Sequence, residues 1–210
     1  MKKILTTLIF IAKNWYTWWV TILTALGNIK VFKTPLFVCY DPSEFDYKIR
    51  GEQIREIESK IEPGDIVLRQ YDHYLDSCLI PGDYSHSGIY VGDNKVIHAV
   101  AEGVKEVDLI DFCQADKICV LRLAHLDADH IKVNAVINAK SFVGSSYDFL
   151  FDSDSSDLYC HEMTAKSYKD IDIPTFPVTL FGYTFKFLKP KYLADSFLKN
   201  ANFTKVIEYK

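Results

Sequence analysis

Residues 85–98 read Ser85-His86-Ser87-Gly88-Ile89-Tyr90-Val91-Gly92-Asp93-Asn94-Lys95-Val96-Ile97-His98. Two runs of alternating apolar residues are joined here by a Gly-Asp-Asn turn, which predicts a β-hairpin. Each predicted strand carries one histidine, His86 in the first and His98 in the second. Because successive side chains of a strand point to opposite faces, the pairing of the two strands decides whether these imidazoles can meet.

The length of the turn sets this pairing. A two-residue loop, Asp93-Asn94, would place His98 opposite Ile89 and therefore on the other face from His86. An odd loop over residues 92–94 would place His98 opposite Gly88 and diagonal to His86, at about 5 to 8 Å. We expect the second pairing, because it brings two imidazoles together above a residue that has no side chain.

A second stretch, Asp157-Leu158-Tyr159-Cys160-His161-Glu162, has the pattern of a helix start with a cysteine in its first turn. We expect Ser156 or Asp157 to be the N-cap, which would place the Cys160 thiol near free backbone N–H groups that stabilise a thiolate. The helix dipole contributes only about 1 kcal/mol to this stabilisation, so we expect a nearby imidazolium to do the larger share of lowering the pKa of the thiol. A thiol, an imidazole and a third polar group are the parts of a cysteine nucleophile.

Composition limits the other possibilities. The chain has 210 residues, of which 49% are hydrophobic, enough for one substantial core. Its formal net charge is -4 and no dense Lys/Arg run is present, so nucleic acid is not an expected partner. The five cysteines are odd in number and form no CxxC pair, so we interpret them as reduced thiols. No cofactor is expected.

Residues 1–30 are predicted to form a hydrophobic leader helix, and residues 31–210 the catalytic domain. Within residues 1–27, one polar stripe contains Lys13 and several threonines, and large apolar residues cover the remaining surface. Three interpretations stay open: a helix packed on the domain, a membrane-surface or membrane-crossing anchor, and a secretory signal. We favour association with a membrane, either at its surface or across it, and a cluster of tryptophans, Trp15, Trp18 and Trp19, suits the lipid headgroup region. A cytoplasmic or exported location stays possible.

The rest of the chain alternates helices with strands that pair locally. Helices are expected at 49–61, 71–80, 108–112, from Asp127 to Gly144, and from Cys160 to about residue 169. Strands are expected at 65–69, in the hairpin, at 118–123 and at 204–209. This order predicts an α+β fold, with an antiparallel sheet or partial barrel packed against helices.

Several of these segments carry a family resemblance. They are Gly64-Asp65-Ile66-Val67-Leu68, Tyr84 to Gly92 with Val96-Ile97-His98-Ala99, Glu102-Gly103-Val104, Tyr147 to Asp152, and Tyr159-Cys160. Over about residues 60–200 the chain resembles the permuted papain-like branch of the NlpC-type cysteine peptidase/amidohydrolase superfamily. The resemblance implies a circularly permuted papain-like fold, in which the histidine strand precedes the cysteine helix.

The resemblance also implies roles for individual residues. Cys160 would be the nucleophile, with its backbone N–H in the oxyanion hole, His86 the general base and His98 the orienting residue. The third position, occupied here by His98, is more often an acid in the permuted branch. Glu102 is therefore the alternative third residue. No role is assigned to His161, which stands where a small residue is usual.

The implied activity is cysteine-dependent hydrolysis of an amide or peptide. A lipid acyltransferase or thiol esterase of the lecithin:retinol acyltransferase type, acting on a lipid ester, is the alternative within this chemistry. A binding module that keeps the fold without turnover is the alternative outside it.

Neither of two kinds of metal site is expected. A zinc site could use Cys160, His161, His86 and His98, but adjacent Cys and His side chains do not easily face one ion. Residues 152–157 are similar to the start of a calcium loop, but Asp157 stands where the loop needs glycine and Met163 where it needs glutamate.

Overall fold

The computed structural model describes residues 15–26, 29–33, 36–40, 47–72, 74, 77, 80–151, 155–180, 183–185 and 188–210. Residues 1–14 of the predicted leader helix lie outside the described residues, as does half of the short helix expected at 71–80. The chain divides into two compact units: Met1–Glu44 with His73–Cys78, and Phe45–Asp72 with Leu79–Lys210.

The first unit contains a helix over residues 15–26 and a small antiparallel pair, β1 (Ile29–Lys33) and β2 (Leu36–Tyr40). Trp15, Trp18 and Ile22 share one face of the helix and are 52%, 62% and 51% exposed. Trp15 also stacks on Trp19, with 6.4 Å between the ring centroids. Within the described part of the chain, no helix combines the length and apolar character that a membrane crossing requires.

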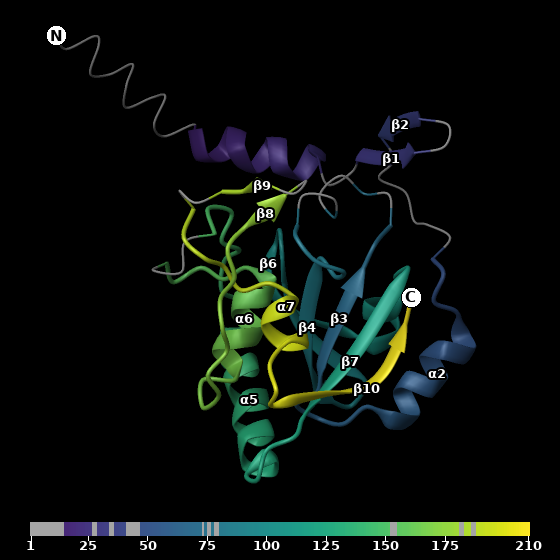
Figure 1. The fold of residues 1–210 in the computed structure, drawn as a ribbon, viewed down its shortest axis with the longest axis vertical. Helices are drawn as coiled ribbons and strands as arrows, with labels where there is room; N and C mark the ends of the chain where they lie inside the picture. The colour runs from purple at the N-terminus through teal and green to yellow at the C-terminus, as the bar shows by residue number, and fades with distance from the viewer. Residues whose placement is uncertain are drawn as a thin grey trace, which may run out of the picture. The chain divides into compact units, whose positions relative to one another are not determined.

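The second unit is built on an open six-stranded sheet in the order β10-β7-β3-β4-β5-β6 (Figure 1). All neighbouring strands are antiparallel, which confirms the predicted α+β class. The strands are β3 (Ile66–Gln70), β4 (His86–Gly92), β5 (Lys95–Val100), β6 (Gly103–Asp108), β7 (Lys117–Leu123) and β10 (Phe203–Tyr209). A separate two-stranded sheet consists of β8 (Thr179–Leu180) and β9 (Tyr183–Thr184).

Helices cover both faces of the large sheet, and each face has its own hydrophobic core. On one face, the first core joins Ile66, Leu68, Ile89 and Ile97 to buried residues of α5 (Ala128–Phe142) and α6 (Cys160–Ser167). On the other, the second core joins Val67, Val96 and Val120 to α2 (Gly51–Lys60) and α4 (Leu109–Cys113). Figure 1 shows α5 and α6 side by side at one flank of the sheet and α2 at the other.

The apolar patterns predicted most of these elements. The strand expected at 118–123 is β7, the strand expected at 204–209 is β10, and the helix expected after Asp127 is α5. Asp127 precedes α5 as predicted, although its side chain makes no capping hydrogen bond. A last short helix, α7 (Asp195–Leu198), leads into β10.

Candidate active site

The hairpin of β4 and β5 pairs Gly88 with His98, as the sequence analysis predicted. The means by which it does so differs from the expectation. The turn is a two-residue loop, Asp93-Asn94, closed by Gly92 and Lys95, and both loop residues have positive φ, 51° and 56°. A β-bulge between Tyr90 and Gly92 supplies the extra residue that shifts the pairing by one.

This pairing brings the two histidines together. Nε2 of His86 and Nδ1 of His98 lie 2.8 Å apart, a hydrogen-bond distance. Their rings meet edge to face, with 5.1 Å between centroids. The ring of Phe112, from α4, packs against both, at 5.8 Å from His86 and 5.4 Å from His98. The pair is therefore held on the face of the sheet that carries the second core.

Gly88 lies between the two histidines, and its lack of a side chain is required by the packing. A Cβ atom there would lie 2.7 Å from Cγ1 of Val96, 2.9 Å from the carbonyl oxygen of Ile97 and 3.1 Å from Cε2 of Phe112. The first two distances are shorter than real Cβ contacts, and one of them is to backbone, which cannot move aside. Gly88 thus permits β5 and α4 to approach β4 closely at the histidine pair.

Cys160 is the first residue of α6 and is only 4% exposed. The N-cap is Tyr159, not Ser156 or Asp157 as predicted, and its side chain does not cap the helix. The helix begins C-terminal to the predicted caps because burial and a hydrogen bond hold Leu158 and Tyr159 outside it. Both are 3% exposed, and the Leu158 backbone N–H donates to the Ser146 carbonyl oxygen at 3.1 Å. Cys160 therefore lies at the N-terminal end of the helix, where backbone N–H groups have no partner within the helix.

The thiol of Cys160 contacts the residues on either side of His86. The thiol donates to the carbonyl oxygen of Ser85 at 3.9 Å, and the backbone N–H of Ser87 is near enough to lower the pKa of the thiol. Burial raises the pKa of this thiol to about 11, while the backbone N–H groups of Ser87, His161 and Cys160 and the charge of Arg69 act in the opposite direction. The structure therefore describes a resting thiol that carries its proton.

The imidazoles are also neutral at rest. Burial lowers the pKa of His98 to about 3, with the charges of Arg69 and Lys105 acting in the same direction. Burial, Arg69 and His98 likewise lower the pKa of His86. A neutral histidine pair shares one proton along its hydrogen bond, with one ring donating and the other accepting.

His161, which the sequence left without a role, belongs to a buried hydrogen-bond chain. Its Nδ1 lies 2.8 Å from Oγ of Ser87, which in turn lies 2.9 Å from Oγ1 of Thr164. The Thr164 hydroxyl donates to the carbonyl oxygen of Cys160 at 3.0 Å. Because each hydroxyl has a single proton, Ser87 must donate to Thr164 and accept from Nδ1–H of His161. The chain ties the first turn of α6 to β4, next to His86.

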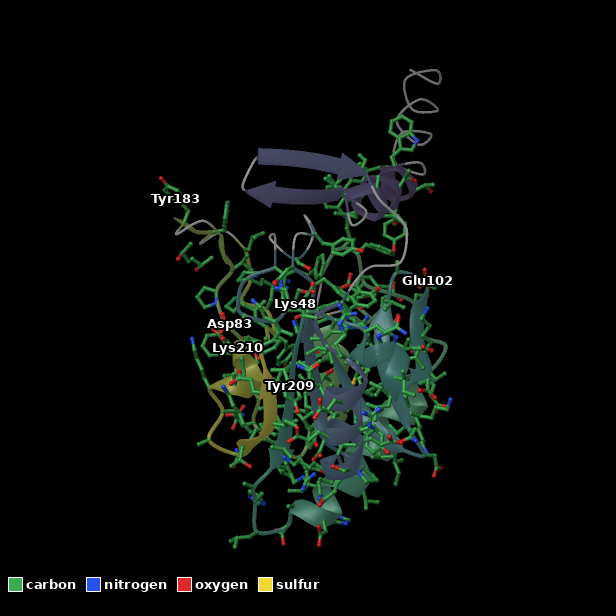
Figure 2. The ribbon with its side chains drawn as sticks, turned by 90° about the vertical axis from the view of Figure 1, so that its right-hand side faces the viewer. Lys48, Asp83, Glu102, Tyr183, Tyr209 and Lys210 are labelled. Atoms are coloured by element: carbon green, nitrogen blue, oxygen red, sulfur yellow. The ribbon has the colours of Figure 1, made fainter. Side chains whose placement is uncertain are left out.

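Glu102, the alternative third residue, lies in the turn between β5 and β6. Its side chain is 72% exposed and pairs with Lys105 at 3.2 Å. Figure 2 shows Glu102 at the outer margin of the sheet. The residue that hydrogen-bonds to His86 in the structure is His98.

Two features of this site were not predicted from the sequence. Arg69 of β3 pairs with His86 across the sheet and is 9% exposed; its signal was a single charged residue at the end of an apolar run. The Ser87–Thr164 contact joins residues far apart in the chain and left no local signal. Among the described residues, no group of three or more His, Cys, Asp or Glu side chains could hold a metal ion.

Comparisons with known proteins agree with the fold described above. In the solved structures, the chain is similar to the metalloprotein yiiX from Escherichia coli O157:H7, with a TM-score of 0.60 and 19% identity. The match covers 71% of this chain and 98% of that one, and at this identity it shows the fold alone. No curated protein matches the sequence. The family model of the permuted papain-like amidases, YaeF/YiiX type, C92 family, matches residues 60–206, and the chain therefore belongs to this family.

Proposed function

We propose that this protein is a cysteine amidase or peptidase, in which Cys160 is the nucleophile, His86 the general base and His98 the residue that orients it. The observation that carries the proposal is the position of the Cys160 sulfur, which contacts Ser85 and Ser87 on both sides of a histidine whose Nε2 is held by His98. The family supports amide hydrolysis as the reaction.

The hydrogen bond between the histidines is compatible with the tautomers needed for this role. If Nε2–H of His86 donates to Nδ1 of His98, then Nδ1 of His86 has a free lone pair to take the thiol proton. The imidazolium formed in this way keeps its Nε2–H bonded to His98, which stabilises it. His98 carries its own proton on Nε2 and stays neutral throughout.

The reaction then proceeds in two steps, acylation of the thiol and hydrolysis of the thioester. The Cys160 proton passes to His86, Sγ bonds to the carbonyl carbon, the C–N bond breaks, and the imidazolium gives its proton to the leaving amine. Water next adds to the thioester, with His86 taking its proton, and the C–S bond breaks to return the thiol and release the acid. The backbone N–H of Cys160 stabilises the oxyanion in both steps. Because thiol and imidazole are neutral at rest, proton transfer accompanies attack rather than preceding it.

A substrate panel with matched variants tests this function. Cys160→Ala and His86→Ala should each abolish hydrolysis of amides and peptides while circular dichroism stays native, because the two residues act as one unit. Cys119→Ala, which removes another buried thiol, and His130→Ala, which removes an exposed histidine, should keep full activity. Activity that survives in either active-site variant would refute the mechanism. Turnover of lipid esters without turnover of amides would instead identify the acyltransferase alternative.

We also propose that residues 1–27 hold the enzyme at a membrane surface. In the described part of this segment, Trp15, Trp18 and Ile22 expose an apolar stripe. The hydroxyls of Thr21 and Thr24 donate to carbonyl oxygens one turn earlier, both at 2.9 Å, so these side chains need no water. Tryptophan prefers the headgroup region, which suits a helix that lies in the plane of the membrane.

A further inference from the structure

Arg69 carries a buried positive charge that no described carboxylate neutralises. The residue is 9% exposed, and burial lowers the pKa of its guanidinium. Four ionisable groups are near enough to raise the pKa of the guanidinium: Tyr71, Cys160, Cys113 and Tyr47. Their ordinary pKa values leave all four uncharged at neutral pH. A buried charge without a counter-ion is strongly unfavourable, so this arrangement needs a reason.

Arg122 shows how the same fold neutralises another arginine. Its Nε and one Nη bind both carboxylate oxygens of Asp65, at 2.9 and 2.7 Å, and its other Nη lies 2.7 Å from Glu62. Arg69, in contrast, uses Nη1 to donate to the carbonyl oxygen of Phe112 at 3.1 Å, and its buried Nε has no partner among the described residues. The edge formed by Nε and Nη2 is the edge with which arginine binds a carboxylate through two hydrogen bonds.

The position of Arg69 puts its guanidinium beside the histidine pair. Arg69 and His86 are directly paired across β3 and β4, so their side chains share a face with Cβ atoms about 5 Å apart. The guanidinium lies over the ring of Phe112, at 4.4 Å from its centroid, and the same ring supports His86. The guanidinium also lies over the ring of Tyr71, with its Cζ 5.0 Å from the ring centroid.

We propose that Arg69 binds a carboxylate of the substrate, and that the substrates are amides whose leaving amine carries that carboxylate. N-acyl amino acids and the last peptide bond of a chain belong to this class. The inference rests on the proposed function, since it assumes that His86 protonates the leaving nitrogen. Because Arg69 is the cross-strand neighbour of His86, a group bound by Arg69 lies on the leaving-amine side of the scissile bond and not on the acyl side.

Binding to full-length Cys160→Ala protein tests the proposal without turnover. The probes are N-benzoylglycine and N-benzoylglycinamide, which differ only in the carboxylate, and titration calorimetry measures both affinities. We expect the acid to bind at least tenfold more tightly than the amide, which is a modest value for a charge-assisted bidentate contact. Adding Arg69→Met should abolish this preference, whereas Arg55→Met, at an exposed arginine of α2, should leave it unchanged.

Several results would overturn the proposal. These are equal affinity for the two probes, no binding of N-benzoylglycine up to about 10 mM, well above ordinary ligand affinities, and a preference that survives in folded Arg69→Met protein. If Arg69→Met does not fold, Arg69→Lys replaces it and should still weaken the preference severalfold, because lysine lacks the planar fork.

Turnover by the wild-type enzyme separates this proposal from the proposed function. Hydrolysis of neutral and acidic amides at the same kcat/KM would leave the amidase standing and refute the role of Arg69. Selective binding of the acid by Cys160→Ala protein, with no hydrolysis of any amide by the wild type, would support the carboxylate site and refute the amidase.

Discussion

Burial of His161 makes a quantitative prediction about stability. His161 is 2% exposed, and burial lowers its pKa to about 3, whereas a histidine in an unfolded chain titrates near 6.5. The unfolded state therefore binds a proton that the folded state refuses whenever the pH lies between these values. The contribution of this histidine to stability is fully present above pH 6.5 and is lost as the pH falls toward 3.

At pH 5 the pH is about 1.5 units below the pKa of this histidine in the unfolded chain. Protonation of the unfolded state therefore lowers the free energy of unfolding by about 2 kcal/mol. His161→Gln removes the titration and keeps a group that can hydrogen-bond to Ser87. The free energy of unfolding of the wild type should therefore fall between pH 8 and pH 5 by about 2 kcal/mol more than that of His161→Gln. The other titrating groups are common to both proteins, so their contributions cancel apart from the effect of His161 on the pKa of His86.

Urea unfolding followed by circular dichroism at the two pH values measures this difference of differences. His130→Gln, which changes an exposed histidine instead, should retain the wild-type pH dependence. If His161→Gln and the wild type lose the same free energy between pH 8 and pH 5, then His161 is not held neutral in the folded protein. The buried chain from His161 to Thr164 would then be incorrectly assigned.

Three further predictions concern the thiol, the glycine between the histidines, and the leader. Inactivation by iodoacetamide should be slow at pH 7 and should rise with pH, because burial raises the pKa of Cys160 to about 11; a rate that stays constant down to pH 5 would show a preformed thiolate. Gly88→Ala should destabilise the fold by about 1 to 3 kcal/mol in thermal unfolding and reduce turnover, because its Cβ meets the Ile97 carbonyl oxygen at 2.9 Å; unchanged stability and activity would contradict the packing. Full-length protein should sediment with liposomes, and a variant that starts at Lys30 should not; full-length protein that stays monomeric in the supernatant would rule out the membrane role.

The sequence predicted those parts of the fold that depend on local patterns. Alternation identified the hairpin, and helical periodicity identified α5, because each signal lies within one element. The pairing of Gly88 with His98 was predicted by requiring the two histidines to meet. The bulge that produces it was not, because Tyr90, Val91 and Gly92 continue the strand pattern without interruption.

Features that depend on contacts between distant segments could not be predicted. Tyr159 is the N-cap because the residues before the helix are fixed by burial and by a loop some distance earlier in the chain, whereas capping preferences favoured Ser156 or Asp157. His161 is understandable only once α6 packs on β4 and places it beside Ser87. Arg69 is unusual because no carboxylate among the described residues lies beside it, and only the folded structure shows this.

The bulge between Tyr90 and Gly92 has a consequence for how this family can evolve. Asp93 and Asn94 can be exchanged for other residues that tolerate positive φ without changing which strand positions pair. The loss of one residue from the bulge, in contrast, would turn His98 away from His86 although every side chain of the site remained in the sequence. In an alignment of active relatives, gaps at this hairpin should therefore comprise even numbers of residues. A relative with a single-residue deletion there is expected to be inactive, however well its histidines and its cysteine are conserved.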